Sequence, residues 1–209
     1  MYALRPEFGP TLPELLSGRS KAWRYALIGG YVLILVIVLY MLLLRGDPTS
    51  TTVTKKGDVG FKLTYDGALK EKPPVGDERL RLEGTRGREV TVKPLQLPSY
   101  KGRAEGLLPV YMQSLIGAMQ EQYPGFEIRR EGRTAVSRIP GYEVVFQYKR
   151  DGKTSYGRRI LLVDSYAPEA RDGVDLLLLE NRSSVVHNAD AVGTAGSLKT
   201  LLRSFRFQN

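Results

Sequence analysis

Arginine is the residue type that could do most of the chemistry in this chain. Between residues 129 and 159 the sequence holds nine basic residues and three acidic ones. Guanidinium groups bind carboxylate and phosphate oxygens through paired hydrogen bonds. The segment therefore predicts a site for an anion or an acidic partner, with the candidate residues Arg129, Arg130, Arg133, Arg138, Arg158 and Arg159. The alternative is a solvated charged edge, because edge strands carry charge to avoid aggregation.

Residues for common catalytic sites are scarce. The chain has no cysteine and one histidine, His187, which excludes thiolate chemistry and multi-histidine metal sites. A serine triad would have to combine His187 with Ser183 and either Asp190 or Asp164, and no Gly-x-Ser-x-Gly sequence is present. No glycine-rich loop has the spacing that opens a helix onto a phosphate. We expect no catalytic residue, metal or cofactor, and a hydrolase is a remote alternative.

An uncharged stretch of nineteen residues, Ala26 to Leu44, predicts a membrane-spanning helix. As a helix it would rise about 28 Å, close to the roughly 30 Å hydrocarbon core of a bilayer. Trp23, Tyr25 and Tyr40 near its ends are typical of membrane interfaces. The alternative, a cleaved signal peptide, has a shorter apolar region followed by small residues.

The charges that flank this stretch predict its orientation. Arg19, Lys21 and Arg24 precede it, whereas Arg45 alone lies in the matching stretch after it. The positive-inside rule then places the N-terminus in the cytoplasm and the rest of the chain outside the cell membrane. A net charge of +9 suits an anionic partner. Nucleic acid is not expected on that side of the membrane.

The chain divides into four predicted parts. Residues 1–25 form a cytoplasmic tail, 26–44 the span, 45–58 a flexible linker and 59–208 a single extracytoplasmic domain. In the tail, four apolar residues could dock a cytoplasmic protein, namely Phe8, Leu12, Leu15 and Leu16. The alternative is a disordered tail that rests at the membrane surface.

Hydrophobic periodicity predicts the elements of the domain. Alternation favours strands over residues 59–65, 142–148 and 156–163 and a hairpin over 80–92, and the unbroken apolar run 174–179 favours a central strand. Three-and-four spacing predicts helices over 108–123 and near 194–204. The expected fold is therefore α+β, a largely antiparallel sheet packed by two helices in a layered sandwich, preceded by one transmembrane helix.

Several strings in the domain resemble the PsbP/Mog1-like superfamily, in its membrane-anchored bacterial type. They are the opening Gly60-Phe61-Lys62-Leu63-Thr64-Tyr65, the central run 140–148 followed by 157–163, and the closing Leu201-Leu202-Arg203-Ser204-Phe205-Arg206-Phe207. The resemblance covers about residues 59–208. It implies binding or assembly rather than catalysis, since its members include an extrinsic photosystem subunit, a Ran-binding protein and many bacterial lipoproteins. It assigns no site residue.

These observations favour a single-pass, non-enzymatic scaffold whose domain engages a protein partner in the envelope or membrane. The alternative is a domain that binds anionic lipid or cell-wall polymer through the basic segment 129–159. The two hypotheses differ in salt dependence, because a contact with an apolar centre tolerates moderate salt and a charged one does not.

Overall fold

The computed structural model describes residues 21–44, 50–56, 59–98, 102–164 and 171–208. Its contacts divide the chain into two units, Met1–Asp47 and Pro48–Asn209. The tail residues Phe8, Leu12, Leu15 and Leu16 lie outside the described residues, so their docking role stays a prediction.

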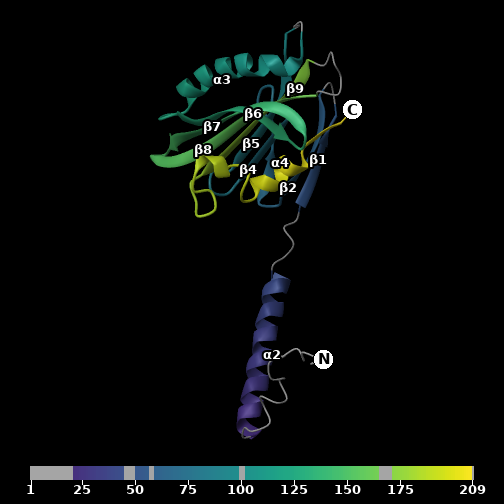
Figure 1. Ribbon diagram of the computed structural model, residues 1–209, viewed down its shortest axis with the longest axis vertical. Coiled ribbons are helices and arrows are strands. Elements are labelled where there is room, and N and C mark those ends of the chain that lie inside the picture. The colour runs from purple at the N-terminus through teal and green to yellow at the C-terminus, as the bar shows by residue number, and fades with distance from the viewer. Residues whose placement is uncertain (1–20, 45–49, 57–58, 99–101, 165–170, 209) are drawn as a thin grey trace, which may run out of the picture. The chain divides into compact units, whose positions relative to one another are not determined.

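The first unit contains the helix α2 (Lys21–Leu44), which covers the whole uncharged stretch (Figure 1). The side chains described on it, Tyr25 and residues 31–39, are exposed. In the described part of the chain, no helix meets the length and apolarity that a membrane crossing requires. The span at Ala26–Leu44 therefore stays a prediction.

The second unit is an α+β domain with two antiparallel sheets. The larger sheet has seven strands in the order β3-β4-β5-β9-β8-β7-β6. Its strands are β3 (Leu69–Lys72), β4 (Leu80–Gly84), β5 (Glu89–Gln96), β6 (Glu127–Val136), β7 (Ile139–Arg150), β8 (Lys153–Val163) and β9 (Asp172–Asn181). The smaller sheet has the order β1-β2-β10, from β1 (Ser50–Lys55), β2 (Gly60–Asp66) and β10 (Arg206–Gln208).

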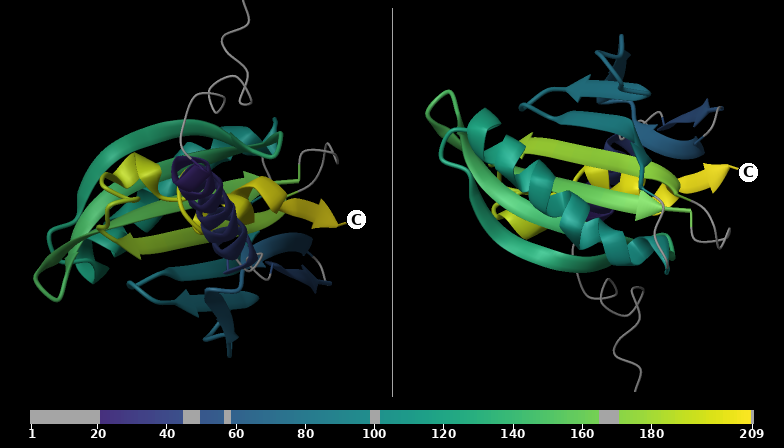
Figure 2. Two further views of the ribbon diagram at one scale, coloured as in Figure 1. Left: turned by 90° about the horizontal axis from the view of Figure 1, so that it is seen from below. Right: turned by 90° about the horizontal axis from the view of Figure 1, so that it is seen from above.

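Each face of the larger sheet buries its own hydrophobic cluster. The helix α3 (Leu108–Gln122), with the short turn η1 (Ala104–Leu107) before it, covers one face. The helix α4 (Leu198–Ser204), the turn η2 (Ala189–Ala191) and the smaller sheet lie on the opposite face, as Figure 2 shows. We call these the α3 face and the α4 face. The layered arrangement leaves β9 buried on both sides, as its apolar run predicts.

Two tight hairpins fix the register of the strands next to the α4 face. At the β7–β8 turn, Asp151 and Gly152 have φ of 51° and 73°, the left-handed pair that an Asp-Gly turn favours. At the β6–β7 turn the same conformation falls on Ser137 and Arg138, with φ of 54° and 72°. This second turn has no glycine, which is why the sequence gives little sign of it.

The structure confirms the α+β class and the antiparallel pairing, and it differs from prediction in two respects. Two sheets form instead of one. Residues 50–55, expected within a flexible linker, form β1 and pair along β2 from Ser50↔Asp66 to Lys55↔Phe61. The threonines of β1 explain this, because β-branched residues suit strands, and Thr52 Oγ1 lies 3.0 Å from Thr64 Oγ1.

Candidate functional site

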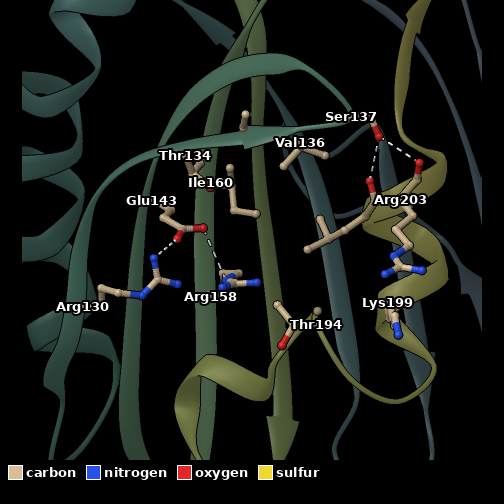
Figure 3. Close-up of a pocket in the computed structure, with 13 residues that line it drawn as sticks. Arg130, Thr134, Val136, Ser137, Glu143, Arg158, Ile160, Thr194, Lys199 and Arg203 are labelled. Carbon is tan, nitrogen blue, oxygen red and sulfur yellow. Dashed lines mark hydrogen bonds and ion pairs between the residues drawn. The ribbon is translucent and has the colours of Figure 1, made fainter.

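A cavity of about 370 Å³ opens on the α4 face, between strands β6, β7 and β8 and the segment that carries α4 (Figure 3). Cationic side chains reach it from both walls, Arg130 and Arg158 from the sheet and Lys199 and Arg203 from α4. One carboxylate, Glu143, also lines it. The remaining lining residues are Thr134, Ala135, Val136, Ser137, Ile160, Gly193, Thr194 and Leu202. Its charge makes this cavity the best candidate site in the described residues.

A β-bulge at Arg129 places Arg130 on the cavity side of the sheet. The register of the β6–β7 pairing shifts here, because Ile128 pairs with Phe146 and Arg130 pairs with Val145. In a regular strand, residues two apart point to the same face of the sheet. Here the extra residue Arg129 puts Ile128 and Arg130 on opposite faces. Val145 also pairs with Arg158 on the neighbouring strand β8. Arg130 and Arg158 therefore lie on either side of Val145, on the same face of the sheet.

Glu143 joins the two arginines. This residue is 2% exposed, with Oε1 2.5 Å from Arg130 Nη1 and Oε2 3.4 Å from Arg158 Nε. Arg130 also donates from Nε to Asp190 at 2.8 Å. This hydrogen bond, partly offset by burial, raises the pKa of Arg130. Arg130 is therefore neutralised from two sides.

Arg158 is less well satisfied. It is 5% exposed, and its buried Nε, which lies 3.4 Å from Glu143 Oε2, has no hydrogen-bond partner. Burial, only partly offset by Glu143, lowers the pKa of Arg158. Gly193, at φ 73°, lies beside this guanidinium, and a Cβ there would come within 3.6 Å of Arg158 Nη1. Incomplete pairing of a buried charge is costly, so the position of Arg158 beside the cavity makes it a candidate anion-binding group.

The helix side of the cavity supplies uncompensated charge. Lys199 and Arg203 lie four residues apart on α4, on the side that lines the cavity (Figure 3). Within the described part of the chain neither one pairs with a carboxylate. Residues four apart on a helix are neighbours, so their charges act together at one wall.

A hydrogen-bonded brace holds the two walls together. Ser137 Oγ, at the β6–β7 turn, donates to the carbonyl oxygens of Leu202 and Arg203 at 3.2 and 2.8 Å. These carbonyls belong to the last turn of α4, where backbone acceptors lack helical partners. The turn thus fixes the end of the helix against the sheet.

Comparison with solved structures identifies the fold. The chain is similar to cyanobacterial PsbP from Synechocystis, with a TM-score of 0.53, 11% identity, and coverage of 78% of this chain and 95% of that one. The domain has a PsbP/Mog1-like fold. It is also similar to LpqN, a Mycobacterium tuberculosis protein involved in cell envelope biogenesis, with a TM-score of 0.51, 9% identity, and coverage of 78% and 94%. No protein-family model matches the chain, and no curated protein matches it in sequence.

The PsbP/Mog1-like domain brings together only part of the predicted basic site. Arg130 and Arg158 meet at the cavity. Arg159 lies on the α3 face, as alternation predicts, and its Nε donates to Asp175 Oδ1 at 2.9 Å. Burial alone would lower the pKa of Arg159, but the hydrogen bond and the charge of Asp175 together outweigh it and raise the pKa. Arg129 pairs with Glu127 at 2.7 Å, so neither residue adds to the cavity.

Two predicted residues lie away from the cavity, and two residues that line it were not predicted. Arg133 and Arg138 are exposed and do not line the cavity. Lys199 and Arg203 were not among the candidates, although two basic residues four apart on the polar side of the predicted last helix are a signal of a charged face.

The residues of the hypothetical serine triad have other contacts in the PsbP/Mog1-like domain. Ser183 Oγ accepts a hydrogen bond from the Val186 amide at 3.0 Å. Asp190 accepts from Arg130. His187 is exposed, and its carbonyl oxygen accepts from Tyr156 OH at 2.9 Å. The side chains of Ser183 and Asp190 are thus engaged in hydrogen bonds within the domain.

Proposed function

We propose that this chain is a membrane-anchored, non-enzymatic binding protein of the cell envelope whose domain holds an anionic group of its partner in the basic cavity. The observation that carries the proposal is Arg158, a buried guanidinium that shares the carboxylate of Glu143 with Arg130, at a cavity lined by three further cations. Such a group lowers its energy by accepting an anion, because burial without full pairing is costly.

The anchoring and the location rest on other support. The uncharged stretch 26–44 and the basic residues before it favour a single span with the domain outside the cell. LpqN, which has a similar fold, is involved in cell envelope biogenesis. Both point to the same compartment, where anionic lipid headgroups and acidic wall polymers are available ligands.

The surface favours an anionic ligand over a protein contact with an apolar centre. The large apolar side chains exposed on the described part of the domain are Val75, Val110, Ile128 and Val185. Val110 lies on α3, Ile128 on β6, and Val75 and Val185 in two loops, so these side chains come from four separate segments and not from one apolar face of an element. If the partner is a protein, as the scaffold hypothesis holds, we expect it to bind by placing acidic side chains in the cavity.

The test compares two charge-matched double variants of the full chain, held in phosphatidylcholine nanodiscs. The probes are soluble polyglutamate and vesicles of phosphatidylcholine with or without phosphatidylglycerol. K199S/R203S removes two cations from the cavity, and R133S/K153S removes two exposed cations outside it. Wild-type binding should fall steeply between about 50 and 500 mM salt, as expected for charge contacts.

The cavity variant should bind at least about tenfold more weakly, since each basic residue near an anionic surface contributes about 1 kcal/mol. The control variant should bind nearly as well as wild type. Equal losses in both variants would show diffuse surface charge and refute the cavity as the site. No binding to any anionic probe would refute the function.

A further inference from the structure

Resting on the proposed function, we infer that the cavity is built for a dianionic phosphoryl group, a phosphate monoester, in preference to a carboxylate or a phosphodiester. The inference narrows the ligand to one chemical class. It follows from the charge balance of the cavity, from the arrangement of its cations on two walls, and from its size.

The charge balance leaves two positive charges without partners. Four cations line the cavity, Arg130, Arg158, Lys199 and Arg203, against Glu143 in the lining and Asp190 on Arg130. A phosphate monoester carries about −1.5 to −2 charges near pH 7. A monoester would therefore neutralise the two unpaired positive charges of the cavity. A carboxylate or a phosphodiester carries a single negative charge and would leave about one positive charge unpaired.

The geometry favours a tetrahedral group. Arg158 faces the cavity from the sheet, and Lys199 and Arg203 face it from α4 (Figure 3). A carboxylate offers two oxygens in one plane, which suits a single arginine fork. A phosphoryl group offers three terminal oxygens that point in different directions, so that one group can reach both walls at once.

Gly193 lies beside the Arg158 guanidinium, and its φ of 73° is a conformation that favours glycine. A Cβ at this position would lie 2.4 Å from Leu202 Cδ1, so that the leucine side chain would have to move. An oxygen in the cavity would approach Arg158 at the Nη1 side, next to Gly193, since Nε is buried against Glu143.

The size and lining of the cavity fit a phosphate with a short organic part. A volume of about 370 Å³ is at the lower end of ordinary ligand pockets. Val136, Ile160 and Leu202 provide an apolar wall beside the cations. Glycerol or sugar phosphate would fill this space, either as a soluble molecule or as the headgroup of a lipid such as phosphatidic acid. The recognised chemistry is the same in both.

The test measures binding of small phosphates to the full chain in phosphatidylcholine nanodiscs by titration calorimetry. The probes are glycerol 3-phosphate, a monoester, dimethyl phosphate, a diester, and acetate. We expect glycerol 3-phosphate to bind at least about tenfold more tightly than either monoanion at pH 7.5. Competition by phosphatidic acid vesicles, compared with phosphatidylglycerol vesicles, shows whether a lipid headgroup also enters.

A pH series tests the charge of the ligand directly. The charged groups that face the cavity are Arg130, Glu143, Arg158, Lys199 and Arg203, with Asp190 behind Arg130. Between pH 7.5 and 5 the affinity for glycerol 3-phosphate should fall about tenfold, because the second phosphate pKa is about 6. Dimethyl phosphate keeps one charge in this range and reports any titration of the protein itself, so its affinity should stay within about twofold.

The variants separate the two proposals. K199S/R203S should lower the affinity for glycerol 3-phosphate at least tenfold and reduce its preference over dimethyl phosphate, whereas R133S/K153S should change neither. Equal affinity for monoester and diester would overturn the dianion inference and leave the anion-binding function standing. If vesicles or polyglutamate bind through the cavity but no small phosphate binds, the dianion inference is likewise overturned and the anion-binding function stands. Absence of all anion binding would overturn both.

Discussion

Replacing Glu143 with glutamine should destabilise the domain and tighten anion binding at the same time. The side chain is 3% exposed and contacts both cavity arginines of the sheet. Removing one partner of a buried ion pair costs about 3–5 kcal/mol. The cost here should be about 2–3 kcal/mol, because glutamine keeps one acceptor and Arg130 is partly exposed and keeps Asp190.

The gain in affinity follows from the size of the cavity. A sphere of 370 Å³ is about 9 Å across, and two unit charges at about 8 Å interact by about 1–2 kcal/mol at an effective dielectric constant of about 20–40. Removing the negative charge of Glu143 should therefore tighten binding of a monoanion about 5- to 30-fold, and binding of a dianion such as glycerol 3-phosphate by at least as much.

The assays for this prediction are urea denaturation for stability and titration with glycerol 3-phosphate for affinity. Glu131→Gln is the matched control, since the exposed Glu131 accepts a hydrogen bond from Tyr142 OH and does not line the cavity. An unchanged or weaker affinity in E143Q, in a protein that remains folded, would refute the electrostatic reasoning.

Three further substitutions test the packing and the buried charge. Gly157→Ala should cost about 1–3 kcal/mol in urea denaturation, because its Cβ would lie 2.2 Å from the ring of the fully buried Phe146. Gly117→Ala, in a helix with open space around it, should instead stabilise by about 1 kcal/mol, and a loss there would contradict the packing. Glu180→Gln should stabilise at pH 7.5 by about 1–2 kcal/mol, since burial raises the pKa of this acid and its Oε2 has no partner. The folded state holds this proton more tightly than the unfolded state, so the penalty develops as pH rises and the difference between Glu180→Gln and wild type should shrink toward pH 4 in pH-dependent denaturation; a constant difference would contradict it.

The hydrophobic pattern of the sequence predicted the strands and the faces on which their side chains lie. Alternation placed Arg158 and Arg159 on opposite faces of one strand, and the apolar run of residues 174–179 marked a strand covered on both sides. These patterns depend on side-chain period alone. The fold class followed from them.

The composition of the site could not be predicted in the same way. The face of Arg130 depends on a bulge at Arg129, and nothing in the sequence of an arginine-rich strand marks where an extra residue will fall. Lys199 and Arg203 reach the cavity only because α4 packs across the sheet and Ser137 binds its last carbonyls. Such contacts join distant segments, which periodicity does not report.

The position of β2 between β1 and β10 has a consequence for how the domain folds. One edge of β2 pairs with a strand a few residues away, while the other pairs with Arg206–Gln208, and Ser204 Oγ accepts a hydrogen bond from the Thr64 amide across 140 residues of sequence. Contacts of such separation form late, because a long loop must close first. Until then β2 has an open edge of the kind that recruits other chains. The same step delivers α4 to the sheet, so that a nascent chain would acquire its cavity only at the end of folding.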